Sequence, residues 1–161
     1  MAQHKTLAFF IPHRGCPHQC SFCDQQTISG TVQAPTPEEV TQTCQAMLER
    51  SGSLESAEIA FFGGSFTAVE PAYQIALLEA AQPFLGEGMF SGIRISTRPD
   101  AVDSAVLERL ERYHVTAVEL GAQSMCDRVL YQNERGHDAQ AVRQASAMLR
   151  ERGFSLGLQQ M

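Results

Sequence analysis

Three cysteines lie close together near the start of this chain, with the spacing CxxxCxxC at Cys16, Cys20 and Cys23. Thiolates bind zinc and iron-sulfur clusters, and three thiolates on one loop suit a cluster. A cubane cluster takes four ligands, so three protein thiolates would leave one iron open to bind another molecule. The alternative is a zinc site, to which His13 or His18 supplies the fourth ligand.

The composition agrees with metal binding in a reducing compartment. The chain has 161 residues, of which five are cysteine and 43% are hydrophobic, and its formal net charge is -6. Clustered cysteines in an otherwise ordinary sequence indicate a metal site rather than a disulfide framework. The sequence contains neither a run of roughly 20 apolar residues nor a signal peptide at its start. We therefore expect a cytoplasmic protein without a membrane segment, whose acidic charge disfavours gripping nucleic acid by charge alone.

Short apolar runs alternate with helical patterns along the chain. The predicted strands cover Leu7–Ile11, Glu58–Phe62, Ile93–Thr97, Thr116–Leu120 and Phe154–Gln160. Predicted helices begin near Pro37, Pro71, Asp103 and Asp138, and a short helical turn covers Asp127–Gln132. This alternation predicts an α/β fold with a parallel sheet or barrel and right-handed crossovers.

The first predicted helix has a clear start signal. Thr36 precedes Pro37, and Glu39 occupies the position that completes a capping box. Val40 and Cys44 then recur at helical spacing on one face. Cys44 is therefore predicted to be a small buried apolar side chain rather than a ligand.

Polar residues gather where the predicted strands end. A period of two places Ser96 and Arg98 on one face near the C-terminal end of the third strand. It likewise places Glu119, Gly121 and Gln123 on one face of the fourth. Active sites of parallel barrels lie at these C-terminal ends. Arg98 and Glu119 either form a structural ion pair or line a substrate chamber.

Taken in order along the chain, these motifs resemble the radical SAM superfamily. Residues 96–100 (STRPD), 118–124 (VELGAQS) and 133–137 (NERGH) resemble segments of the catalytic subunit of Elongator (Elp3) and, more distantly, of oxygen-independent coproporphyrinogen dehydrogenase. The resemblance implies a partial parallel (βα)6 barrel of the radical SAM type. About five βα units would be present in residues 1–161, and the sixth unit and the acetyltransferase domain would be missing. The chain stops at Met161 within the fifth apolar segment, so we expect one core domain that is incomplete at its C-terminus.

The same resemblance implies cofactors and a reaction. Cys16, Cys20 and Cys23 would hold a four-iron four-sulfur (4Fe-4S) cluster whose open iron binds S-adenosylmethionine. Reductive cleavage would give a 5'-deoxyadenosyl radical, which abstracts hydrogen from an unidentified substrate. RNA is a possible substrate by family analogy alone, and the electron donor would be a protein such as flavodoxin or ferredoxin.

Five residues match cofactor-binding positions of the family. Phe22 would lie near the adenine, and the backbone of Gly63 and Gly64 would receive the methionine amino group. Gln123 would contact the ribose, and Arg135 would pair with the methionine carboxylate through its planar fork. The plain structural alternatives are a core aromatic residue, a tight turn and a solvated charge at a helix end.

Other residues in these segments carry weaker expectations. Much of the superfamily has Glu at the position of Ser65, whereas Elongator-like members have Ser, as this chain does. The serine removes a carboxylate from the site. Glu119 is included among the candidate cofactor contacts, and Gln159 is a further candidate. His137 and Asp138 are expected to form a turn and a helix cap.

Two other functions remain open at this point. The chain would be a catalytically silent fragment if the incomplete barrel keeps a cluster but cannot hold S-adenosylmethionine. It would be a structural or nucleic-acid-binding module if the cysteines hold zinc, although the acidic charge and the long αβ series disfavour this.

Overall fold

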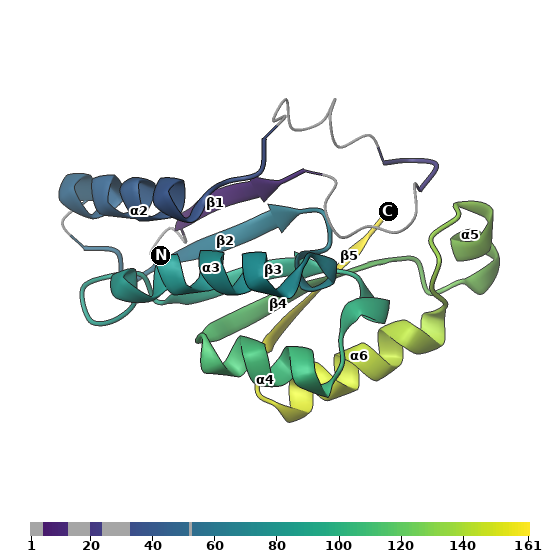
Figure 1. Cartoon of the computed structure of the whole chain (residues 1–161). Helices are drawn as coiled ribbons and strands as arrows, with labels where there is room; N and C mark the ends of the chain where they lie inside the picture. The colour runs from purple at the N-terminus through teal and green to yellow at the C-terminus, as the bar shows by residue number, and fades with distance from the viewer. Residues whose placement is uncertain (1–4, 13–19, 24–32, 52) are drawn as a thin grey trace.

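Five parallel strands form one sheet in the computed structural model, which describes residues 5–12, 20–23, 33–51 and 53–161. The strands are β1 (Lys5–Ile11), β2 (Ala57–Gly63), β3 (Gly92–Thr97), β4 (Val115–Gln123) and β5 (Ser155–Gln160). Each strand pairs with the next one along the chain, in the order β1-β2-β3-β4-β5 (Figure 1). All five predicted strands and their parallel arrangement are confirmed.

Helices follow the strands in the predicted alternation. The longer helices are α2 (Pro37–Ser51), α3 (Pro71–Ala81), α4 (Ser104–Arg112) and α6 (Ala139–Glu151), and they cover one face of the sheet (Figure 1). The short helix α5 (Asp127–Gln132) lies beyond the end of the sheet at which the strand arrows point (Figure 1). No helix within the described ranges combines the length and the apolar character needed to cross a membrane.

Side-chain caps start these helices where the sequence indicates. The backbone N–H of Thr36 donates to Glu39 Oε2 over 2.8 Å, and that of Glu39 donates to Thr36 Oγ1 over 3.2 Å, which completes the predicted capping box. Asp103 and Asp138 accept hydrogen bonds from backbone N–H groups three residues later, each over 2.8 Å. The expectation that Asp138 caps a helix is therefore confirmed.

The hydrophobic core lies between the sheet and the helices. Ile59 and Phe61 of β2 and Ile93 and Ile95 of β3 are fully buried on this face, because alternate residues of a strand point the same way. Cys44 of α2 packs into the same core, and burial raises the pKa of its thiol to about 12. Cys44 is thus the buried apolar side chain that was predicted.

The opposite face of the sheet carries a row of charges. Arg94 Nε contacts Glu58 Oε2 at 2.8 Å, and Arg94 Nη1 contacts Glu119 Oε1 at 2.5 Å, so one guanidinium joins β2 to β4. The Glu119 carboxylate lies over Gly157 of β5, where a Cβ atom would overlap it. Of the two alternatives for Arg98 and Glu119, the structural ion pair is therefore wrong, because Glu119 pairs with Arg94 and Arg98 pairs with Asp100 in the turn after β3. The lining of a substrate chamber stays a prediction.

Candidate functional site

Two of the three clustered cysteines lie in the described part of the chain, at the C-terminal edge of the sheet. Cys20 is buried, with 5% of its surface exposed, and its carbonyl accepts a hydrogen bond of 3.0 Å from the backbone N–H of Cys23. Cys16, His13 and His18 lie outside the described residues. Within the described ranges, no group of three or more His, Cys, Asp or Glu side chains is placed to hold a metal ion.

The segment that contains these cysteines is bonded to the chain after α5. The Ser21 hydroxyl donates to Asn133 Oδ1 over 2.8 Å, and the backbone N–H of Ser21 donates to the Asn133 carbonyl over 3.4 Å. Arg135 Nη1 lies 3.5 Å from Cys20 Sγ. The fourth βα unit thus positions the cysteine segment of the first.

Gly63 and Gly64 form the turn that ends β2. Gly63 has a φ of +111°, and a Cβ atom at this position would overlap the carbonyl oxygen of Ile11. The backbone N–H of Gly64 donates to that same oxygen over 2.8 Å. Glycine is required at position 63 both by the backbone angle and by the close approach of the end of β1. The interpretation of a tight turn is confirmed, and contact with a cofactor stays a prediction.

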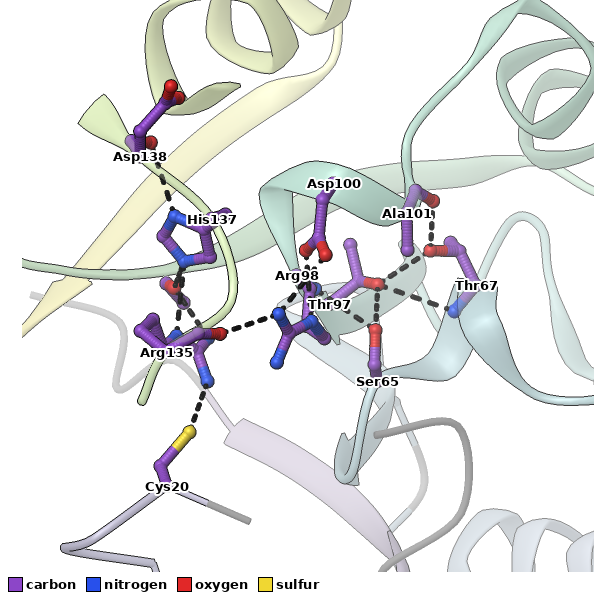
Figure 2. A network of polar contacts seen from close by, with 11 residues as sticks. Cys20, Ser65, Thr67, Thr97, Arg98, Asp100, Ala101, Arg135, His137 and Asp138 are labelled. Atoms are coloured by element: carbon purple, nitrogen blue, oxygen red, sulfur yellow. Dashed lines mark hydrogen bonds and ion pairs between the residues drawn. The ribbon is translucent and has the colours of Figure 1, made fainter. Parts of the chain in front are cut away.

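Ser65 belongs to a buried hydroxyl cluster that joins β2 to β3. Its Oγ lies 2.8 Å from Thr97 Oγ1 and accepts a hydrogen bond of 3.1 Å from the backbone N–H of Arg98. Thr67 Oγ1 lies 2.6 Å from Thr97 Oγ1 and donates to the carbonyl of Ala101 (Figure 2). The hydroxyl of Ser65 therefore fixes the start of the turn that begins at Arg98. A buried carboxylate in place of this hydroxyl would need a positive charge to balance it.

Arg98 is a buried cation with one nitrogen left over. Only 2% of the residue is exposed, and its Nε and Nη2 contact the Asp100 carboxylate at 2.9 and 3.1 Å. Nη2 also donates to the carbonyl of Arg135 over 2.7 Å (Figure 2). Nη1 is buried and has no hydrogen-bond partner among the residues that the structure describes. A buried unpaired donor is costly, so this nitrogen stands out at the edge of the site.

Arg135 is also buried, with 8% exposed, and three acceptors surround its guanidinium. Nη2 donates to the carbonyl of Gly121 over 2.6 Å, and Nε donates to His137 Nε2 over 3.1 Å, in addition to the contact of Nη1 with Cys20 Sγ (Figure 2). A Cβ atom at Gly121 would overlap Nη2. The alternative of a solvated charge at a helix end is therefore wrong for Arg135.

His137 is held on both ring nitrogens. Besides the bond from Arg135, its Nδ1 lies 3.2 Å from the carbonyl of Asp138, and its Nε2 lies 3.3 Å from the carbonyl of Gly121. Burial lowers the pKa of His137 below its ordinary value of 6.5, and the positive charges of Arg135 and Arg98 act in the same direction. The carbonyl of Asp138 and the carboxylate of Asp100 oppose this shift.

The remaining candidates lie at the margin of this cluster. Gln123 ends β4 with a φ of +63°, and the register of β4 against β5 is irregular from Leu120 to Gln123, so strict alternation stops before Gln123. Phe22 is 37% exposed and is not a core aromatic residue. Gln159 is exposed on β5. Glu119 belongs to the charged row on the sheet, away from Arg98.

Sequence reasoning missed two residues. Arg94, rather than Arg98, pairs with Glu119; the signal was its place two residues before Ser96, on the same face of β3. His137 contacts the Arg135 side chain, and the signal was the Arg-Gly-His order, in which Gly136 with a φ of +81° turns the chain back.

The fold and this edge define a class of protein. Strands in sequential order, crossover helices on one face and polar side chains at the C-terminal ends are the features of a partial parallel (βα) barrel. A comparison with known families matches residues 10–158 to the Radical SAM superfamily. The chain therefore belongs to the radical SAM superfamily.

Relatives place the chain near the Elongator-type members. It is 25% identical over 174 residues to the tRNA uridine(34) acetyltransferase of Dehalococcoides mccartyi (strain CBDB1), with 88% of this chain and 38% of the relative covered. It is 26% identical over 141 residues to Protein YhcC of Escherichia coli (strain K12), with 85% and 44% covered. The chain thus spans less than half of the length of either relative.

A solved structure shows the same fold. The archaeal Methanocaldococcus infernus Elp3, with residues 1-46 deleted, aligns with a TM-score of 0.67 at 18% identity and covers 97% of this chain. The aligned region is 38% of that structure. The predicted fold class and the Elp3-like resemblance are confirmed.

Proposed function

We propose that this chain is the core of a radical SAM enzyme in which Cys16, Cys20 and Cys23 bind a 4Fe-4S cluster and the edge of the sheet binds S-adenosylmethionine. When bound together, these groups supply one-electron cleavage of the sulfonium to a 5'-deoxyadenosyl radical that abstracts hydrogen from a substrate. Family membership and the cluster of Cys20, Arg98 and Arg135 support this proposal.

The described residues fit both groups. Cys20 offers a buried thiol whose sulfur lies 3.5 Å from the Arg135 guanidinium, and cysteine sulfur is the usual ligand of iron-sulfur clusters. Arg98 and Arg135 carry two positive charges at this edge, and the carboxylate of Asp100 pairs with Arg98. The surplus charge, together with the unpaired Nη1 of Arg98, favours a ligand with a carboxylate group.

The chain's own residues would bind and orient the ligand. Arg135 holds its guanidinium at the end of β4 through Gly121 and is directed toward the cysteine segment (Figure 2). Gly63 brings the ends of β1 and β2 together, because it has no side chain that would overlap the carbonyl of Ile11. The location of Gly63 and Gly64 at the C-terminal end of β2 and of Arg135 beside the end of β4 supports the cofactor roles that the resemblance assigns to them.

Anaerobic reconstitution tests the proposal directly. The purified chain is incubated with iron and sulfide, its iron and zinc are quantified, and 5'-deoxyadenosine is measured after reduction with dithionite in the presence of S-adenosylmethionine. We expect about four irons per chain and formation of 5'-deoxyadenosine. A chain that binds a cluster but never cleaves the cofactor would be the silent fragment, and one that retains zinc would be the structural module.

Two cysteine variants assign the cluster to the loop. Cys20→Ala should abolish cluster binding, because a buried ligand of the CxxxCxxC motif is lost. Cys126→Ala is the matched control, since Cys126 is an exposed thiol before α5 and outside the motif. Equal iron contents in the two variants would contradict the assignment.

A further inference from the structure

We propose that His137 is a positioning residue that orients Arg135 for a ligand carboxylate by acting as a neutral hydrogen-bond acceptor. This inference rests on the proposed function, because it names a second residue behind the same subsite. His137 itself would not touch the ligand. Its effect would pass through the guanidinium of Arg135.

The hydrogen bonds around the imidazole select one tautomer. Arg135 Nε is always a donor, so its 3.1 Å contact with His137 Nε2 requires that this ring nitrogen be unprotonated. His137 Nδ1 then carries the hydrogen and donates to the carbonyl of Asp138 at 3.2 Å. The Nδ1–H tautomer satisfies the contacts with Arg135 and Asp138. The Nε2–H tautomer would satisfy only the 3.3 Å contact with the carbonyl of Gly121, which already accepts from Arg135 Nη2 over 2.6 Å.

The acceptor decides which edge of Arg135 faces the ligand. With Nε bonded to His137 and Nη2 bonded to the Gly121 carbonyl, the guanidinium plane is fixed at two points. Nη1 is then directed toward Cys20 (Figure 2). A fixed plane matters because a carboxylate binds the guanidinium fork in its plane. Without the acceptor, the side chain can rotate about its last bonds and lose that alignment.

Protonation would remove this arrangement. A protonated His137 has donors on both nitrogens and would place a second cation against Arg135. The charged groups that act on the imidazole are the cations Arg135 and Arg98 and the carboxylate of Asp100. Two cations against one carboxylate favour the neutral ring, in agreement with its partial burial.

Two substitutions separate positioning from general structural support. His137→Gln places an amide oxygen near the former Nε2 and so keeps an acceptor for Arg135 that does not titrate. His137→Ala removes the acceptor. A purely structural role would make both variants weaken every ligand alike, whereas a positioning role makes the loss depend on the ligand's carboxylate.

The experiment measures calorimetric affinity for two ligands, S-adenosylmethionine and decarboxylated S-adenosylmethionine, with the anaerobically reconstituted chain. For S-adenosylmethionine we expect His137→Ala to bind about tenfold more weakly than the parent, as for a lost bond to a charged group. His137→Gln should restore the affinity to within about twofold. For the decarboxylated ligand, we expect all three proteins to bind within about twofold of one another, because the carboxylate that Arg135 holds is absent. Equal losses with both ligands, or no loss in His137→Ala, would overturn the inference.

The tautomer is measured independently of any ligand or substitution. Nitrogen-15 NMR of the unsubstituted chain at pH 7.5 should show His137 with an unprotonated Nε2 and a protonated Nδ1. The opposite tautomer would overturn the inference, even if His137→Ala fails to fold. If the parent chain does not bind S-adenosylmethionine at all, the proposed function fails, and the tautomer still decides whether His137 accepts from Arg135.

Discussion

Buried charged and titratable side chains lie at the C-terminal edge of the sheet. Arg98 and Arg135 are both buried cations, and His137 lies between the second of them and the carbonyl of Gly121. Buried charges are tolerated only when they are paired and hydrogen-bonded. The pH and the identity of each side chain should therefore have measurable effects on stability.

The pH dependence of stability should reveal His137. Its pKa is below 6.5 in the folded chain and near 6.5 in the unfolded chain, so the unfolded state binds more protons between these two values. The free energy of unfolding should consequently fall as the pH drops below about 6.5 and level off once the pH is below the folded pKa. His137→Gln lacks this proton uptake. Urea unfolding at pH 7.5 and 5.5 should therefore show a larger loss in the parent than in the variant, and equal losses would contradict the assignment.

Arg98 should contribute more to stability than an exposed arginine with a similar ion pair. Arg98→Gln breaks the contacts with Asp100 and with the Arg135 carbonyl in a buried setting, and we expect a loss of about 3 kcal/mol. Arg152→Gln is the control, because Arg152 pairs with Glu111 at 2.8 Å on the surface; there we expect at most about 1 kcal/mol. Urea denaturation of both variants measures the difference, and similar losses would argue against a special role for Arg98.

The pairing partners at this scale were only partly predictable from sequence. Arg135 was identified through its register with Gln123 and the family resemblance, whereas its hydrogen bond to His137 depends on the turn at Gly136. An ion pair between Arg98 and Glu119 was one of two alternatives that rested on a period of two, but Arg98 lies in the turn after β3 and Arg94 pairs with Glu119 instead. Alternation along a strand predicts faces well and fails at the first residue of a turn.

Turns between elements set how close the strands can come at the site. Gly63 allows the end of β2 to approach Ile11 of β1, and this contact lies immediately before the cysteine segment. Gly88 also has a positive φ of +74°, but nothing lies within 4 Å of the position of its Cβ. A side chain at Gly63 would meet both a steric overlap and an unfavourable φ, whereas one at Gly88 would meet only the unfavourable φ. Comparing the two positions therefore separates these two contributions to the free energy of unfolding.

Replacing these two glycines should give clearly different results. Gly63→Ala forces a Cβ into the Ile11 carbonyl and adopts an unfavourable φ, so we expect a loss of about 3 kcal/mol or more. Gly88→Ala meets only the unfavourable backbone angle, and we expect about 1 kcal/mol. Thermal and urea unfolding compare the variants. A larger loss at Gly88 would show that the approach of β2 to Ile11 is not tight in solution.

The contact between Glu119 and Gly157 links β4 to β5. We expect Gly157→Ala to destabilise the chain by about 2 kcal/mol, because the added methyl displaces the carboxylate that pairs with Arg94. With Glu119→Ala already present, the same change should cost less than about 1 kcal/mol. A double-mutant cycle from urea unfolding measures this coupling, and additive effects would rule out the contact.

At the scale of elements, the sequence was a reliable guide. Caps at Thr36, Asp103 and Asp138 and short apolar runs identified the helices and strands because local signals determine where such elements begin. β4 continues to Gln123, beyond the predicted end at Leu120. The extension includes Gly121 and lies where Arg135 packs, and sequence-local patterns do not contain that tertiary contact.

The whole molecule has a sheet with two different faces. One is covered by helices and carries the core, and the other carries the row formed by Glu58, Arg94 and Glu119. β2, β3 and β4 each have a paired strand on both sides, whereas β5 is mostly exposed at Leu158–Gln160. The backbone amides of the sheet should therefore be protected unequally against hydrogen exchange.

Native-state hydrogen exchange tests this order. We expect the amides of β2 and β3 to exchange slowest, at a rate governed by global unfolding, and those of β5 to exchange by local opening. The measurement uses the chain as it is, with exchange followed by NMR or mass spectrometry. Uniform protection over all five strands would contradict this picture.

The contact between Cys20 and Arg135 joins residues 115 positions apart. Synthesis at about 5–20 residues per second needs on the order of ten seconds to add the residues between them. During synthesis, the thiol of Cys20 therefore emerges well before the guanidinium that later lies beside it. Iron and sulfide delivered to the growing chain in that interval would bind a cysteine loop that does not yet contact Arg135. Iron and sulfide delivered afterwards would bind a loop that is already hydrogen-bonded to the fourth βα unit.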